Sequence, residues 1–248
     1  MSIKTDGDST TPVTGGGGGG ASILTGTYAA LPAPGTDGNL YIPTDSYYLF
    51  RDNGSAWIPF LNGHQITLPV NGDFSWVNQG TGTIDATKGG LYLEDQSGQV
   101  TESFRMRIKT APTPPYTIDV AFMPSIGADN FNYMCVNWRD STTGRFYGYF
   151  VNQLGLVILY KYNNTFSWNS EYALMQPRIM AGPTYVRLED DNTDLVLHFS
   201  GDGVQYREIF RVIRTDFLAD PDQVGFALSN QNNQGNGLGM TILAWDEA

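Results

Sequence analysis

The chain has 248 residues, of which 13% are aromatic and only 16% charged, and its formal net charge is -11 with a pI of about 4.4. This acidity excludes a surface that neutralises nucleic-acid phosphates, because such surfaces depend on Lys and Arg, and it disfavours an anionic membrane surface for the same reason. Cys135 is the single cysteine, which excludes a disulfide within the chain and a cysteine-based zinc site.

Residues 1–22 are polar and contain six consecutive glycines, Gly15 to Gly20. This composition cannot bury a core and predicts a flexible arm, either a disordered tail or a tether that becomes ordered only on a partner. No apolar signal core follows the start, and no segment is long enough to span a bilayer. We therefore expect synthesis in the cytoplasm without the usual export route.

Residues 23–63 predict a small β-unit with three strands at 38–43, 47–51 and 56–60. Asn53-Gly54 gives a hairpin signal between the last two strands, because a tight turn needs positive φ. Three strands of this length are marginal alone, so the unit should dock on another copy or on a larger assembly. The candidate docking residues are Tyr41, Tyr47, Tyr48, Phe50 and Trp57.

Residues 64–72 read as a connector, and 73–248 as about a dozen short strand-like runs separated by turn residues. Aromatic and β-branched side chains dominate these runs, many of which alternate with period two, and no helical pattern lies between them. The sequence therefore predicts an all-β protein whose body is an antiparallel two-sheet sandwich.

A group of aromatic residues lies close in sequence to several amides, including Asn152 and Asn169. Exposed rings stack on the C–H faces of sugars while amides pair with hydroxyl groups, so this group is a candidate glycan-binding site. The alternative is that half of the rings belong to the core and the others to a protein interface. The candidate contacts are Tyr147, Tyr149, Tyr160, Tyr162, Phe166, Trp168, Asn163 and Asn164.

Three patterns approach a catalytic or metal site without completing it. Glu189-Asp190-Asp191 followed by Asp194 is the nearest approach to a paired-carboxylate glycosidase run, but it occupies a predicted hairpin turn. The two histidines, His64 and His198, have no Gly-x-Ser-x-Gly elbow to complete a triad. The acidic loop residues are interpreted as parts of turns and not as calcium ligands, since no EF-hand pattern is present. We expect no catalytic residue, metal or cofactor.

Two parts of the chain resemble known families. LTGTYAALPAPG at 24–35, LYIPTD at 40–45 and RDNGSAW at 51–57 resemble short modules of tailed-bacteriophage fibre and head-decoration proteins. FSWVNQG at 74–80 looks like the opening strand of a concanavalin A-like (laminin G-like) jelly-roll domain found in phage virion proteins. YVRLEDD at 185–191, LVLHF at 195–199, SGDGVQY at 200–206, QVGF at 223–226 and LAWD at 243–246 are similar to its later strands.

The resemblance implies a structural protein of a tailed-phage particle, a head fibre, decoration or tail-fibre tip. It would be made in the host cytoplasm, located in the virion and attached to other virion proteins through its N-terminal arm and small β-unit. Such fibres are often homotrimers. The alternative is a carbohydrate-binding adhesin whose partner is a host surface glycan. A concanavalin A-like glycoside hydrolase is the weaker alternative, because the fold hosts many functions.

Overall fold

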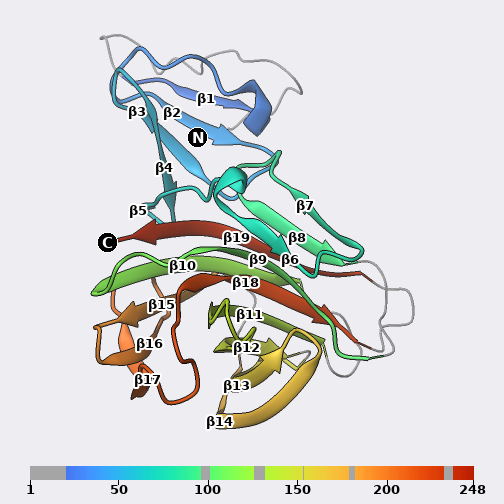
Figure 1. The fold of residues 1–248 in the computed structure, drawn as a ribbon. Helices are drawn as coiled ribbons and strands as arrows, with labels where there is room; N and C mark the ends of the chain where they lie inside the picture. The colour runs from blue at the N-terminus through green and yellow to red at the C-terminus, as the bar shows by residue number, and fades with distance from the viewer. Residues whose placement is uncertain (1–20, 96–100, 126–131, 153, 179–181, 232–236) are drawn as a thin grey trace. The chain divides into compact units, whose positions relative to one another are not determined.

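The computed structural model describes residues 21–248 except 96–100, 126–131, 153, 179–181 and 232–236. The predicted arm, 1–22, thus lies almost wholly outside the described residues. The described elements are strands apart from two short 3-10 turns, Tyr28–Ala30 and Asn71–Asp73 (Figure 1). None of the helical segments in this part of the chain is long and apolar enough to cross a membrane.

The chain divides into two compact units. The small unit comprises Met1–Leu68 and Ala86–Gly90, and the large unit comprises Pro69–Asp85 and Leu91–Ala248. The expected connector, 64–72, holds the last strand of the small unit as well as the boundary itself.

The small unit is a five-stranded sheet in which the strand order follows the sequence order. It keeps the three expected strands and adds one at each edge. The added strand at 23–26 pairs in parallel with the strand at 40–43 across the long connection 27–39, a non-local pairing that strand patterns do not reveal. The added strand at 64–65 pairs with its neighbour over only two residues. The strands are β1 (Ile23–Gly26), β2 (Leu40–Pro43), β3 (Leu49–Asp52), β4 (Trp57–Leu61) and β5 (His64–Gln65).

Aromatic rings form the core of the small unit. Tyr41, Tyr48 and Phe50 are buried, and the Tyr41 hydroxyl donates to the carbonyl oxygen of Thr27 at 2.7 Å. Gly89 brings the 86–90 loop against this core: a Cβ there would lie 2.9 Å from ring atoms of both Tyr28 and Tyr48. These packed rings allow so small a sheet to bury a core of its own.

The large unit confirms the predicted jelly-roll sandwich of two antiparallel sheets with seven strands each. Sheet I contains, in spatial order, β17 (Arg207–Ile213), β16 (Asp194–Ser200), β15 (Thr184–Asp190), β10 (Tyr116–Ser125), β19 (Leu238–Glu247), β8 (Leu91–Asp95) and β7 (Gly82–Asp85). Sheet II contains β14 (Ser167–Arg178), β13 (Leu156–Asn164), β12 (Phe146–Asn152), β11 (Asn132–Arg139), β18 (Gln223–Asn230), β9 (Phe104–Thr110) and β6 (Ser75–Val77).

The main core fills the space between the two sheets. Alternate residues of each strand point into it, as the period of a strand requires; on β11 these are Met134, Val136 and Trp138. The Trp138 indole donates to the Tyr116 hydroxyl at 3.2 Å, which satisfies its N–H inside the core.

A second apolar cluster covers the outer face of sheet II, away from sheet I. It contains the other residues of the same strands, including Tyr133 and Cys135 of β11, and burial raises the pKa of the Cys135 thiol to about 12. Sheet II curls strongly, as the course of β14 shows (Figure 1), and the Phe104 amide of β9 donates to the carbonyl oxygen of Thr165 between β13 and β14 at 2.9 Å. The curl closes this face over its own aromatic side chains.

Candidate functional site

The structure separates the predicted aromatic group into buried and exposed members. Tyr147 and Tyr149 belong to the main core and Tyr162 to the outer cluster, each with at most 1% of its surface exposed. The expectation that these three contact a ligand is therefore wrong, because both faces of β12 are covered and the Tyr162 side chain of β13 is buried in the outer cluster. Burial is also the main reason that the pKa of each phenol is raised above its usual 10.0.

The exposed members lie together at the turn between β13 and β14. Phe166 is 59% exposed and Trp168 51%, and the Tyr160 ring, partly buried, contacts the Trp168 ring edge-on with centroids 6.5 Å apart. Asn163, Asn164 and Asn169 come from the same turn. We call these six residues the Trp168 surface: Tyr160, Asn163, Asn164, Phe166, Trp168 and Asn169.

Hydrogen bonds among the amides shape this turn. Asn164 Oδ1 accepts the Phe166 amide at 2.9 Å, a local turn closure. Asn163 Nδ2 donates to the Trp168 carbonyl oxygen at 3.4 Å, and its Oδ1 accepts from Asn169 Nδ2 at 3.0 Å. Asn169 Oδ1 in turn accepts the Ser170 hydroxyl at 2.8 Å. The amides are thereby oriented, and Asn164 and Asn169 remain exposed at the surface.

Glu102, two residues before β9, anchors the Trp168 surface. Its Oε1 accepts the Tyr162 hydroxyl at 2.7 Å, and its carboxylate also accepts the backbone amide of Trp168. Burial raises the pKa of the Glu102 carboxyl, and these two hydrogen bonds offset only part of that rise. Sequence reasoning missed Glu102, because it lies 60 positions from Tyr162 and no local spacing links the two.

The Glu102→Gln substitution tests this balance. Because the folded-state pKa lies above the unfolded value, the stability due to Glu102 is full below the unfolded pKa and lost as pH rises through the folded one. Gln keeps an oxygen acceptor without the buried charge, so we expect the variant to be at least as stable as the wild type at neutral pH. The difference in unfolding free energy between the variant and the wild type should shrink as the pH falls.

Urea unfolding at neutral pH and below pH 4.5, the ordinary pKa of Glu, measures this difference. Glu171→Gln, which changes an exposed carboxylate of the β13–β14 hairpin that Glu102 contacts, is the matched control. A loss of stability at neutral pH in Glu102→Gln would contradict the expectation.

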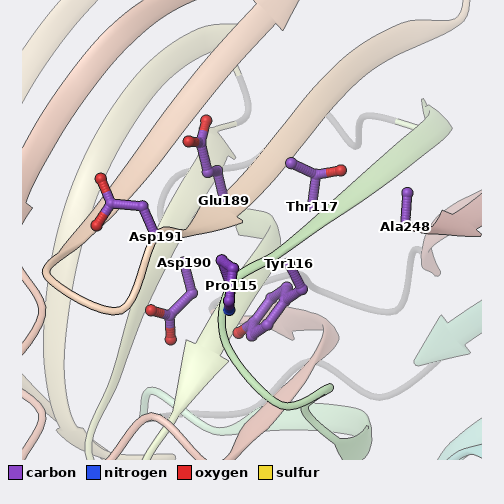
Figure 2. A pocket seen from close by; sticks show the side chains of 7 residues that line it. All are labelled: Pro115, Tyr116, Thr117, Glu189, Asp190, Asp191 and Ala248. Carbon is purple, nitrogen blue, oxygen red and sulfur yellow. The ribbon is translucent and has the colours of Figure 1, made fainter.

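The carboxylates of the β15–β16 turn line a shallow pocket of about 200 Å³ (Figure 2). The buried Asp190 carboxylate points away from those of Glu189 and Asp191 and pairs with Arg214 at 2.8 Å. Asp191 accepts the amides of the turn, which keeps its pKa below the usual value, and Glu189 contacts His198 Nε2 at 2.7 Å. The Asp191 bonds close the hairpin turn that the sequence predicts. Glu189 and Asp190 are instead the last residues of β15, and their partners lie on β16 and directly after β17.

Asp202 also serves a turn. Its Oδ1 accepts the amides of Val204 and Gln205, both at 2.9 Å, and these bonds lower the pKa of its carboxyl to about 2. Among the residues that the structure describes, no group of three or more His, Cys, Asp or Glu is placed to hold a metal ion.

Most of the predicted docking residues are core residues of the small unit. Tyr41, Tyr48 and Phe50 are buried, which corrects their expected role as contacts. Trp57 is half-buried and donates from Nε1 to the Pro32 carbonyl oxygen at 2.6 Å. Tyr47, 57% exposed, is the one member of the five with a largely free side chain.

Comparison with known proteins gives the fold and no family. No protein-family model matches the chain, and no curated protein matches it. Many solved structures are similar. A functionally unknown protein from Saccharomyces cerevisiae is 14% identical with a TM-score of 0.50, and the match covers 73% of this chain and 98% of that one.

Two bacterial proteins are also similar. The GH43 protein BlXynB from Bacillus licheniformis is 12% identical with a TM-score of 0.52, over 73% of this chain and 37% of its own. The carbohydrate binding module CBM66 from Bacillus subtilis is 14% identical with a TM-score of 0.47, over 73% of this chain and 96% of its own. At these identities the likeness to the Saccharomyces cerevisiae protein and to BlXynB shows the fold alone.

Proposed function

We propose that the large unit is a non-catalytic carbohydrate-binding module that contacts sugar through the Trp168 surface. The observation that carries the proposal is the half-exposed pair Phe166 and Trp168, flanked by three amides on one anchored turn. A large aromatic ring left this exposed forgoes the gain of burial in the free protein, which a bound ligand would restore.

The chemistry of the Trp168 surface suits a saccharide. An aromatic face provides a flat apolar platform for the C–H face of a pyranose, and Asn amides offer both donors and acceptors to hydroxyl groups. The turn is held by Glu102 and by the bond from Phe104 to Thr165, so little ordering is needed on binding. The absence of a catalytic step is part of the proposal. It is supported by the engagement of Glu189 with His198, of Asp190 with Arg214 and of Asp191 with the backbone of the turn.

Trp168→Ala is the direct test. Because stacking residues at the centre of a binding surface contribute about 2 kcal/mol or more, we expect a loss of affinity of roughly 30-fold for any glycan the wild type binds on an array. Ile213→Ala, which removes another exposed apolar side chain from β17, is the control and should leave binding unchanged. Equal binding by wild type and Trp168→Ala would refute the assignment of the site.

We also propose that the chain is a component of a tailed-phage particle, in which it forms a homotrimer. The arm and the small unit would attach it to other virion proteins, and the large unit would bind a host surface glycan. The support is the resemblance of residues 23–61 to modules of phage fibre and head-decoration proteins. The face of the small sheet opposite Tyr41 adds to it, because Ile23 and Ile42 are 36% and 43% exposed there beside Leu40. Mass photometry showing only a monomer would contradict the trimer.

A further inference from the structure

The charges around the Trp168 surface are negative. Glu171 of β14 lies directly opposite Tyr160 of β13 in the register, so both side chains stand on one face about 5 Å apart at Cβ. Glu102, just before β9, reaches the neighbouring residues of this surface through the Tyr162 hydroxyl and the Trp168 backbone amide. Two carboxylates therefore flank the ring pair Tyr160–Trp168.

The Tyr160 phenol responds to both carboxylates. Its pKa is raised, first by burial and further by the charges of Glu171 and Glu102, while a hydrogen bond with Tyr133 acts in the opposite direction. An anion placed on this ring would meet the same two charges.

Most cations of the large unit contact groups outside the Trp168 surface. Lys161 sits between Tyr160 and Tyr162 in sequence but points to the other face of β13, where its Nζ lies 4.0 Å from the centre of the Tyr172 ring. Arg207 lies on β17, at the far edge of sheet I, and Arg178 ends β14, ten positions from Trp168. The remaining cations with described side chains each contact another group: Arg105 with Asp95, Arg107 with Asn71, Lys109 with Glu247, Arg139 with Gln223, Arg145 with Phe217, Arg187 with Asp119, Arg211 with Glu208 and Arg214 with Asp190.

The parts of the large unit outside the described residues add no cation. The segments 96–100, 126–131, 153, 179–181 and 232–236 contain no Lys or Arg in the sequence. The whole chain carries a net charge of -11, so the long-range field has the same sign as the local one.

We propose that the Trp168 surface selects uncharged saccharides and rejects anionic ones such as sialosides, uronates and sulfated glycans, an inference that rests on the glycan-binding function proposed above. Glu171 and Glu102 act as specificity-determining residues, because like charges brought together on a partly desolvated surface repel. The rings and amides supply the attraction for a neutral sugar, and the carboxylates discriminate against a charged one.

The experiment is a glycan array of matched pairs, in which each neutral glycan is printed beside its sialylated or sulfated derivative. For each neutral glycan that the full chain binds, titration calorimetry then compares its affinity with that of its acidic derivative. We expect the neutral member to bind roughly tenfold more tightly at low ionic strength, and the gap to narrow at about 1 M salt, where the screening length falls to about 3 Å.

Glu171→Gln is the discriminating variant. It should raise the affinity for the acidic member by about threefold and leave the neutral member unchanged, because it removes charge and keeps shape. Asp220→Asn, an exposed carboxylate between β17 and β18, is the matched control for net charge and should change neither affinity.

The outcomes separate the two proposals. An acidic member bound as tightly as its neutral partner, or one unaffected by Glu171→Gln, overturns the selectivity and leaves glycan binding in place. An array on which no member of any pair is bound overturns the glycan-binding function itself, and the selectivity with it.

Discussion

Asp95→Ala is expected to lower the free energy of unfolding by about 3 to 5 kcal/mol, because it leaves the Arg105 guanidinium buried without its counter-charge. Arg105 Nε lies 3.1 Å from Asp95 Oδ2, and the exposed fractions of the two side chains are 5% and 0%. Asp95 ends β8 of sheet I and Arg105 belongs to β9 of sheet II, so this ion pair joins the two sheets of the sandwich.

Neighbouring groups complete the coordination of this pair. Thr81 Oγ1 donates to Asp95 Oδ1 at 2.5 Å, and Arg105 donates from Nη1 to Ser103 Oγ at 2.8 Å. Gly80 makes room for the guanidinium: a Cβ there would lie 2.5 Å from its central carbon. Removing one group from a buried hydrogen-bond network destabilises the protein strongly, since the remaining polar groups stay desolvated without that partner.

Urea unfolding followed by tryptophan fluorescence measures the effect. Asp220→Ala, which removes an exposed partner of Arg214, is the control and should cost no more than about 1 kcal/mol. The double variant Asp95→Leu with Arg105→Met should recover much of the loss, because no charge is then left buried. An Asp95→Ala midpoint equal to that of Asp220→Ala would contradict a structural role for the pair.

Gly148→Ala is expected to destabilise the large unit by about 3 kcal/mol or to prevent its folding. A Cβ at Gly148 would lie 2.1 Å from the Val136 carbonyl oxygen on the neighbouring strand, where the obstacle is backbone and not a side chain that can rotate. Gly225 is in the same situation against the Arg107 carbonyl oxygen, also at 2.1 Å. Asn137 lies between the two glycines in the register.

The line of residues paired across these strands of sheet II continues from Gly148 to the candidate site. Gly148 pairs with Tyr160, whose ring contacts Trp168. We therefore expect any folded fraction of Gly148→Ala to bind glycan more weakly than the wild type. Gly201→Ala is the control, since a Cβ there has no heavy atom within 4 Å. Unchanged soluble yield and unfolding midpoint in Gly148→Ala would show that the strands can separate to admit the methyl group.

The sequence by itself determined the fold class and the places where the chain turns. Strand-like runs without helical patterns predicted the two-sheet sandwich, because period two and β-branched or aromatic composition are local properties. The turn after Glu189 followed from Asp191-Asn192-Thr193-Asp194, whose side chains close turns and tolerate left-handed backbone; Asn192 has φ of 73°. At Asn53-Gly54 the turn was also found, with positive φ at Gly54 only.

Only the tertiary structure decided which aromatic rings are free. On an ordinary sandwich strand one face is exposed, so alternation separates core from surface. Sheet II curls until both faces of its central strands β11 and β12 are covered, and every residue of β12 is buried, so the run Phe146–Asn152 carries no alternation that could assign Tyr147 or Tyr149. Trp168 is exposed at the tip of the β13–β14 hairpin, where its backbone amide donates to Glu102, a contact across 66 positions of the chain that no local pattern reveals.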